Sequence, residues 1–327
     1  MKKPVKETAT CAALIIASGL TCAKIHAQEY PTKPVRLIVP FAAGGNLDVV
    51  TRPLAHALTL NLGQQVLVEN RAGASGILGT QAVAKAPPDG YTLLMSATIL
   101  VTTPTIMANV PSYDPIRDFK GISTVAIIPQ ILVVHPSLPV HSVNDLIALA
   151  KAQPGKLNYA SGGTGSSSHL ATELFARQAG ISIARISYKS SAPALTDLIG
   201  GSVSFMFDNI STSISQINAG RLRVLAITTA NRSPLLPNVP TAAESMPGYV
   251  AAQFNGMFAP AKMPREIIMR LHSEIRKFVE LPEMKKLYAD QGVTLVSSPS
   301  PEQFDEFVKT EYARWTKVIQ DAGIKDE

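Results

Sequence analysis

Two glycine-rich segments contain residue types suited to binding a small anion. The first is residues 41–48, Phe-Ala-Ala-Gly-Gly-Asn-Leu-Asp, between a predicted strand at 36–39 and a predicted helix. Free backbone N–H groups point outward where a glycine turn enters a helix, which favours an anion site. Residues 38–50 contain no Lys or Arg, so backbone dipoles and small polar groups would hold the anion. The candidate ligand-binding residues here are Phe41, Ala42, Gly44, Gly45, Asn46 and Asp48.

The second segment, residues 159–169, reads Tyr-Ala-Ser-Gly-Gly-Thr-Gly-Ser-Ser-Ser-His and also lies between a predicted strand and a predicted helix. Its hydroxyls and N–H groups suit a carboxylate or another small oxyanion. No Lys follows the glycines as in a phosphate-binding loop, and the spacing is not that of a dinucleotide fingerprint. A plain connecting loop is the alternative, but the pairing with the first segment favours binding. The candidates are Ser161, Gly162, Thr164, Gly165, Ser166 and His169.

Two further charged residues follow predicted strands, and each has two interpretations. Asp208 could accept hydrogen bonds from a ligand amine or hydroxyl, or it could cap the next helix. Lys189 could meet a distal carboxylate of the ligand, or it could be a solvated loop charge. His169 could equally serve as a packing or hydrogen-bonding residue of the second segment.

A hydrolase is the main catalytic alternative, because Ser, His and Asp residues occur near both segments. The sequence lacks the G-x-S-x-G nucleophile motif. Ser168 and His169 are also sequence neighbours, which point in different directions on a helix. The histidines show no H-x-x-x-H spacing, which argues against a metal site. Because the nucleophile motif is missing as well, we expect no enzymatic activity, and we expect no cofactor.

Strand and helix patterns alternate along most of the chain, which predicts an α/β fold with mostly parallel sheets flanked by helices. Predicted strands are residues 36–39, 65–69, 92–95, 131–135, 157–160, 185–187, 204–207 and 222–228. Ser142 and Ser300 begin capping boxes, and Pro264 fits a helix start. Pro53 lies beyond the first turn of its predicted helix and should kink it.

The length of the chain, 327 residues, exceeds what one hydrophobic core usually holds, so we expect two lobes. We expect lobe 1 to comprise residues 30–129 and 254–327, and lobe 2 to comprise residues 130–253. The chain would cross between them near Pro129 and Gln253. Such a clamshell would bind its ligand in the crevice at the strand ends. Trp315 belongs to an apolar helical stripe, which indicates core packing rather than contact with a ligand.

The N-terminus resembles a secretory signal peptide. Lys2, Lys3 and Lys6 precede an apolar segment of about ten residues, shorter than the ~20 that span a membrane. We expect residues 1–27 to be removed by cleavage after Ala27, which predicts that the mature chain is exported. Both cysteines would be lost. Removal of four lysines and one glutamate would leave 26 basic and 23 acidic residues. This small, scattered charge argues against nucleic-acid binding.

From residue 30 onward the chain resembles the periplasmic receptors of tripartite tricarboxylate transporters, the Bug family. The resemblance includes Val-Pro-Phe at 39–41, Pro-Asp-Gly-Tyr-Thr-Leu at 88–93 and Met-Phe-Asp-Asn at 206–209. Further matches are residues 68–76, 154–157, 165–166, 169–170, 188–189, 239–241, 259–261 and Trp315. The resemblance implies a two-lobed (type II-like) periplasmic binding protein that delivers small carboxylates to a membrane permease.

In this family the ligand carboxylate lies between the first-lobe loop and the second-lobe glycine loop, partly held by ordered waters. The resemblance therefore implies contacts from Phe41, Ala42 and residues 44–46 on one side and residues 161–166 on the other. It also places Asp208 at the wall and Ser96 and Thr98 at the edge of the crevice. The sequence departs from the family's usual pattern at residues 46–47 and 97–99, so the resemblance does not determine the shape of the ligand.

We expect a monomeric, non-catalytic receptor that binds a dicarboxylate, tricarboxylate, aromatic acid or amino acid and transiently contacts permease subunits. The absence of a clear cationic side chain near the two glycine-rich loops argues against a highly charged ligand such as citrate. One alternative is a receptor that presents its bound form to a membrane sensor kinase. Another is an exported serine hydrolase, which the missing nucleophile motif disfavours.

Overall fold

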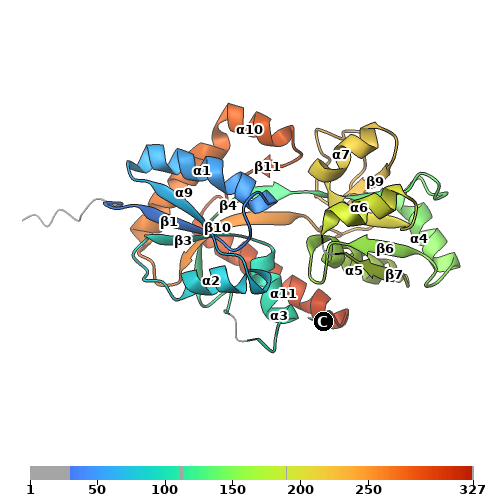
Figure 1. The fold of residues 1–327 in the computed structure, drawn as a ribbon, viewed down its shortest axis with the longest axis horizontal. Helices are drawn as coiled ribbons and strands as arrows, with labels where there is room; N and C mark the ends of the chain where they lie inside the picture. Colours follow the sequence, from blue (N-terminus) through green and yellow to red (C-terminus); the bar gives the residue numbers. More distant parts are fainter. Residues whose placement is uncertain (1–29, 111–112, 189, 326–327) are drawn as a thin grey trace, which may run out of the picture.

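The computed structural model describes residues 30–110, 113–188 and 190–325, which form two lobes (Figure 1). Each lobe contains one sheet flanked by helices, and the strand orders are β11-β4-β10-β3-β1-β2 and β7-β6-β8-β5-β9. This confirms the predicted α/β clamshell. The first sheet comprises β1 (Val35–Val39), β2 (Val66–Asn70), β3 (Thr92–Ala97), β4 (Phe119–Ile128), β10 (Gln253–Pro260) and β11 (Thr294–Leu295). The second comprises β5 (Gln130–Val134), β6 (Asn158–Ser161), β7 (Ala184–Ser187), β8 (Phe205–Asn209) and β9 (Arg223–Ile227).

The helices divide between the two lobes. Those around the first sheet are α1 (Asn46–Leu62), η1 (Ala74–Gly76), α2 (Ile77–Ala84), α3 (Ile99–Ile106), α9 (Arg265–Glu280), α10 (Pro282–Ala289) and α11 (Pro301–Asp321). Those around the second are α4 (Val143–Ala152), α5 (Ser167–Ala179), α6 (Ser191–Ile199), α7 (Ile210–Asn218) and α8 (Ala242–Ser245). Among the described helices, none is long and apolar enough to cross a membrane.

Both sheets are mixed, which corrects the prediction of mostly parallel sheets. Parallel pairs join β1 to β2 and β3, and β6 to β7 and β8. Each antiparallel pair involves β4, β5 or β10. These strands carry the chain between the sheets, since β4 continues into β5 across Pro129 and β10 returns the chain after β9. A parallel pair needs a crossover, usually helical. In contrast, β4 leaves its sheet toward the second lobe, while β5 and β10 each enter their sheet from the other lobe. The lobe boundaries given above remain our proposal.

The predicted helix ends are confirmed at three places. The Ser142 hydroxyl accepts from the N–H of Asp145 at 3.1 Å at the start of α4. The Ser300 hydroxyl accepts from the N–H of Gln303 at 3.2 Å at the start of α11. Pro264 immediately precedes α9. Short polar side chains thus satisfy N–H groups that have no partner within the helix.

Helix α1 continues through Pro53, where the sequence predicted a kink. Proline has no N–H, so it cannot bond the carbonyl of Val49 four residues earlier. The hydroxyl of Tyr288, in α10, donates to that carbonyl at 3.0 Å. A tertiary hydrogen bond therefore takes the place of the missing backbone bond.

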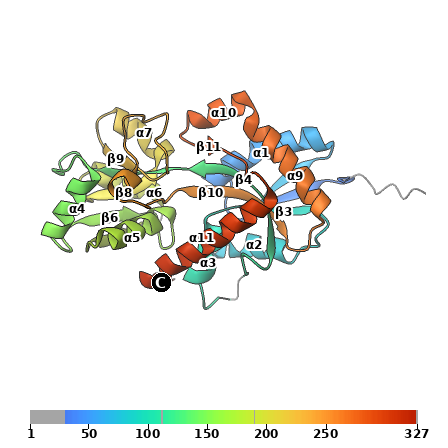
Figure 2. The ribbon, with the colours of Figure 1, turned by 180° about the vertical axis from the view of Figure 1, so that it is seen from behind.

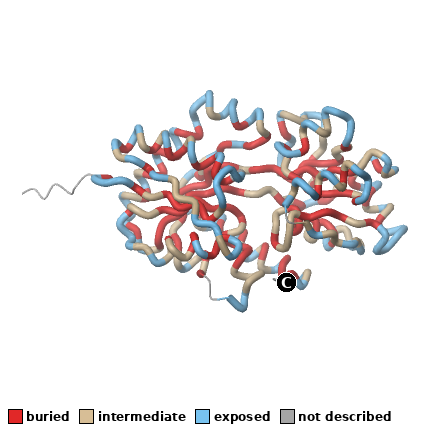
Figure 3. The backbone as a smooth tube through the Cα atoms, viewed as in Figure 1, coloured by how far each residue is buried: buried red, intermediate tan, exposed pale blue. Residues whose placement is uncertain are grey.

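Helix α11 packs along the back of the first sheet, and its C-terminal end reaches the second lobe (Figure 2). Trp315 is 3% exposed and donates its indole N–H to Glu311 Oε2 at 3.0 Å, which confirms its predicted core position. Asp321 at the end of α11 pairs with Arg177 of α5 at 2.9 Å. The buried residues follow the strands through both lobes, while exposed residues lie on the outer helices (Figure 3).

Candidate ligand-binding cleft

A cleft of about 760 Å³ lies between the lobes and is lined from both of them. The first lobe contributes the loop before α1 and the start of α3. The second lobe contributes the loop before α5 and the residue before α6. The structure thus brings together a subset of the predicted site residues, namely Phe41, Ala42, Gly44, Gly45, Asp48, Thr98, Gly165 and Ser166.

Four helices begin at the cleft. Their capping residues Gly45, Thr98, Ser166 and Ser190 precede α1, α3, α5 and α6, and all four line the cleft. Helix N-termini carry a partial positive charge and N–H groups without intrahelical partners. Within the described chain, the side chains of Thr98 and Ser190 make no cap hydrogen bond, and Gly45 has no side chain that could make one. The arrangement therefore offers a small anion several N–H donors.

Asp48 is the one charged side chain among the described lining residues. Its Oδ2 accepts from the N–H of Gly44 at 2.9 Å and from Arg52 Nε at 2.8 Å. Its Oδ1 accepts from Asn70 Nδ2 at 2.9 Å, and the same amide donates to the carbonyl of Phe41 at 3.0 Å. Asp48 therefore holds the 41–45 loop in shape, and its oxygens already have partners.

The charge state of Asp48 follows from these contacts. Burial alone would raise the pKa of this carboxyl group, but the hydrogen bonds from Arg52, Gly44 and Asn70 outweigh burial and lower it. Asp48 is therefore ionised at neutral pH. Arg52 balances its charge, so the first wall of the cleft does not repel an anion as a free carboxylate would.

Backbone and hydroxyl contacts hold the second wall. The Ser166 hydroxyl caps α5 by accepting from the N–H of His169 at 3.3 Å, and it lies 3.0 Å from the Ser168 hydroxyl. The Ser168 hydroxyl in turn accepts from the N–H of Gly162 at 3.0 Å. These bonds fold the glycine segment against the first turn of α5.

His169 supports this wall from behind. Its Nδ1 accepts from the N–H of Gly165 at 3.1 Å, and the residue is only 3% exposed. Burial, with a smaller effect from Arg185, lowers the pKa of His169 to about 4. The ring is therefore neutral at pH 7 and positions Gly165. His169 is not among the residues that line the cleft, and its contacts agree with the packing and hydrogen-bonding interpretation.

Comparisons with known proteins agree with this geometry. Residues 50–324 match the model of the "Tripartite tricarboxylate transporter family receptor". Protein BugT of Bordetella pertussis is 39% identical over 315 residues, covering 95% of this chain and 96% of that protein. The chain belongs to this receptor family.

Two solved relatives have carboxylates in the names of their structures. Rpa4515 of R. palustris with adipate has a TM-score of 0.77 and 38% identity, covering 90% of this chain and 99% of that one. MatC of Rhodopseudomonas palustris with bound malate has a TM-score of 0.73 and 28% identity, covering 89% of this chain and 100% of that one. The family and the fold are those of periplasmic solute-binding receptors.

Three predicted residues of the glycine segment, Ser161, Gly162 and Thr164, are not among the residues that line the cleft of this receptor. Arg185 Nε donates to the Ser161 hydroxyl at 3.1 Å, and its terminal nitrogen donates to the Thr164 hydroxyl at 2.9 Å. Gly162 is held by Ser168, as described above. A cation therefore does reach this segment, although from the neighbouring strand β7. The sequence-based prediction missed it because the two strands become adjacent only in the folded sheet.

Asp208, which the resemblance places at the wall, is likewise not among the residues that line the cleft. It is 1% exposed, and its Oδ2 accepts from the hydroxyls of Thr212 and Ser213, each at 2.6 Å. Burial raises the pKa of this carboxyl group, an effect that these hydrogen bonds only partly offset. Both partners are side-chain hydroxyls in the first turn of α7, whose capping residue is Asn209, so Asp208 joins β8 to α7 through side chains.

The remaining predicted residues divide into two groups. Ser96 is completely buried within β3 and does not reach the cleft. Its position in the strand turns the side chain into the lobe interior. Lys189 lies outside the described residues, and the side chain of Asn46 does as well.

Several lining residues were not predicted. Thr102 lies one helical turn after Thr98, and Gln253 lies at the predicted return crossing, so spacing and position could have indicated both. The Thr98 hydroxyl accepts from the N–H of Phe254 at 3.1 Å, which ties α3 to that crossing. The other unpredicted residues are Ala43, Leu47, Ile99, Ser167, Leu170 and Ser190, while Ala97 belongs to the strand end at residues 95–98 that was expected to reach the crevice.

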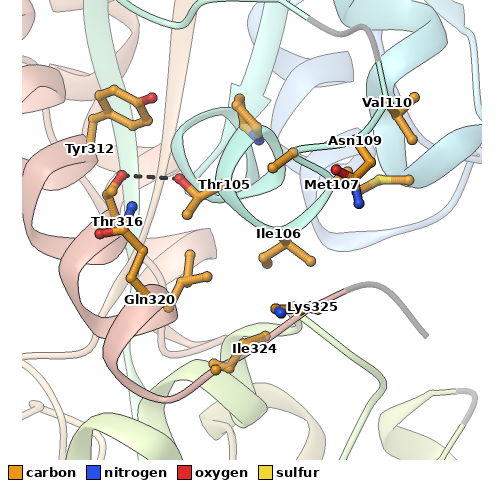
Figure 4. Close-up of a pocket in the computed structure, with 14 residues that line it drawn as sticks. Thr105, Ile106, Met107, Asn109, Val110, Tyr312, Thr316, Gln320, Ile324 and Lys325 are labelled. Carbon is orange, nitrogen blue, oxygen red and sulfur yellow. Dashed lines mark hydrogen bonds between the residues drawn. The ribbon is translucent and has the colours of Figure 1, made fainter.

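A second cavity of about 740 Å³ lies between the end of α3 and the C-terminal end of α11 (Figure 4). Thr105 and Thr316 join across it by a hydroxyl contact of 3.0 Å, and Lys325 is its one charged lining residue within the described chain. First-lobe residues alone line this cavity, unlike the cleft. The described residues contain no cluster of three or more His, Cys, Asp or Glu side chains that could hold a metal ion.

Proposed function

We propose that this chain is a non-catalytic, periplasmic receptor that captures a small carboxylate between its lobes and delivers it to a tripartite tricarboxylate-type permease. Four helix N-termini directed at one cleft carry the proposal, because they favour negative charge without a basic side chain. The adipate and malate named with two relatives support the same ligand class.

The cleft lining narrows the ligand class. Phe41, Leu47, Ile99 and Leu170 supply apolar surface between the helix ends. A ligand with one or two carboxylates on a short hydrocarbon body would match both features. The absence of Lys and Arg among the described lining residues disfavours citrate. We propose Phe41, Ala42, Gly44, Gly45, Thr98, Gly165 and Ser166 as residues that contact it.

The contacts of the serines support a non-catalytic role. A serine nucleophile needs a base within hydrogen-bond reach. His169 Nδ1 instead accepts from the N–H of Gly165, and its Nε2 lies 3.8 Å from Glu173 Oε1. Ser166 and Ser168 bond each other and the backbone. The side chains of Ser166, Ser168 and His169 therefore hold the glycine-rich loop in shape and do not form a nucleophile–base pair.

The proposal is tested by thermal unfolding of residues 28–327 with adipate, malate, citrate, glutamate, benzoate and glucose. A bound acid should stabilise the fold by about 2.7 kcal/mol at a hundredfold excess over Kd. We expect a shift with at least one mono- or dicarboxylate and none with glucose. A protein freed of co-purified ligand by unfolding and refolding that responds to no acid would contradict the proposal. Mass spectrometry of exported protein tests cleavage after Ala27.

A charge substitution at Ser190 tests the class of ligand directly. Ser190 lines the cleft at the start of α6, and Asp and Asn are both good residues for that position. Ser190→Asp should weaken binding of a carboxylate by tenfold or more through repulsion, while Ser190→Asn should change it little. Titration calorimetry measures both. Equal affinities in the two variants would argue against an anionic ligand.

A further inference from the structure

We propose that Tyr288 is a positioning residue for the cleft. Its hydroxyl fixes the first two turns of α1 at the point where Pro53 interrupts the backbone hydrogen bonds. The turn that ends α10, which includes Tyr288, links α1 to the second lobe. The inference rests on the proposed carboxylate-binding function, because it concerns the orientation of the N–H groups at the start of α1.

The first step is the hydrogen bond itself. Pro53 leaves the carbonyl of Val49 without its usual helical partner, and Tyr288 supplies a donor at 3.0 Å from another helix. Tyr288 is 1% exposed. Burial raises its pKa to about 12, so the hydroxyl keeps its proton at neutral pH. This donor is therefore present under all conditions in which the receptor works.

The second step is what the bond controls. Proline is the usual site of helix kinks, because it removes one backbone bond and crowds the preceding turn. The part of α1 before Pro53 contains Asp48 and follows Gly45, both of which line the cleft. Asn70 anchors this part through Asp48, and Tyr288 anchors it through Val49. Loss of the Tyr288 hydrogen bond would leave the part of α1 before Pro53 anchored only through Asp48, so that this part of the helix could pivot.

The third step connects Tyr288 to the other lobe. The N–H of Val293 donates to the carbonyl of Tyr288 at 2.9 Å, and the N–H of Gly292 donates to that of Ala289 at 2.9 Å. Gly292 has φ of 73°, so α10 ends in a Schellman turn that contains Tyr288. A Cβ built on Gly292 would lie 1.9 Å from Ile210 Cγ2. Ile210 begins α7 in the second lobe.

One compact turn therefore contacts the second lobe at Gly292 and holds the ligand-binding end of α1 at Tyr288. A force that the second lobe exerts on Gly292 reaches α1 through the backbone bonds of this turn. The arrangement couples the approach of the lobes to the orientation of the N–H groups in the cleft.

The test begins with hydrogen exchange of the unliganded receptor. Tyr288→Phe should speed exchange in the α1 peptide before Pro53 by about two- to tenfold, the range expected for one lost hydrogen bond. Tyr30→Phe is the matched control, because Tyr30 donates to the carbonyl of Gly90 at 2.7 Å in the same lobe. Adding Pro53→Ala to Tyr288→Phe restores an N–H for Val49 and should restore slow exchange. Unchanged exchange in Tyr288→Phe, or no rescue, would overturn the proposal.

Adipate titration then tests the link to binding. Tyr288→Phe should weaken adipate binding by a similar factor, with recovery in the Pro53→Ala double variant. Ile210→Ala should weaken binding less in the Tyr288→Phe background than in the wild type, because the two act through one turn. Additive effects would overturn the lobe linkage. If wild-type protein binds none of the panel, the proposed function fails, while the exchange result still decides whether Tyr288 fixes α1.

Discussion

Single residues near the cleft mostly hold its loops, and their charge is neutralised or buried. Asp48 pairs with Arg52, His169 is neutral, and Arg185 bonds hydroxyls behind the glycine segment. The cleft surface therefore consists of N–H groups, hydroxyls and apolar side chains. A carboxylate can bind such a surface at neutral pH without displacing an existing ion pair.

His169 should make the receptor sensitive to mild acid. Its folded pKa is about 4, below the usual value of 6.5, so the unfolded chain binds more protons between these values. Stability should therefore fall as the pH falls from 6.5 to 4, by up to about 3 kcal/mol. His169→Asn keeps an acceptor for Gly165 but removes this titration. Urea unfolding at pH 7, 5.5 and 4.5 measures the difference, and parallel pH curves for both proteins would contradict the prediction.

The sequence was informative about the loops because their chemistry is local. Gly44-Gly45 and the serines around Gly165 lie directly before helices, so the anion-binding interpretation needed only neighbouring residues. Partners distant in the sequence could not be predicted in this way. Arg185 reaches Ser161 through strand pairing, and Tyr288 reaches Val49 through helix packing. The same limit explains why Asp208, at a strand end, turned out to contact α7 instead of the cleft.

At the scale of elements, the sequence indicated the strands that bear short apolar runs. Besides the two-residue β11, it missed two long strands, β4 and β10. Each contains a glycine, Gly121 or Gly256, and glycine within a strand weakens a sequence-based assignment. The structure shows why glycine occurs there. A Cβ would lie 2.6 Å from Phe304 Cδ1 at Gly121 and 2.4 Å from Phe304 Cζ at Gly256. Both strands leave room for one aromatic ring of α11.

Gly256→Ala should therefore destabilise the first lobe by about 1–3 kcal/mol, because the added methyl group overpacks the ring of Phe304. Urea unfolding measures the loss. Gly200→Ala is the control, since Gly200 has φ of −75° and a Cβ there would meet no atom closer than 3.5 Å. Similar stability for both variants would show that Phe304 moves aside freely.

At the scale of the whole molecule, the crossings and several contacts among the described residues connect the lobes. Next to the first crossing, Thr228 and Gln130 bond each other within the second lobe through backbone and hydroxyl groups, with distances of 2.8–3.0 Å. Away from the crossings, Ile106 packs on Gly165, Ile210 packs on Gly292, and Arg177 pairs with Asp321. Closure of a clamshell about such crossings is a hinge motion. The two glycines allow the lobes to approach more closely than any other residue type would.

Gly165 gives a prediction for this closure. A Cβ on Gly165 would lie 2.5 Å from Ile106 Cδ1, so Gly165→Ala should hold the lobes apart on that side. Small-angle scattering should show a smaller compaction with ligand in this variant than in the wild type. Gly165 has φ of 73°, so alanine also adds backbone strain. Adding Ile106→Val separates the two effects, because it deletes the Cδ1 atom and leaves the strain unchanged. Compaction should return in the double variant if the contact limits closure, and should stay reduced if backbone strain is the cause.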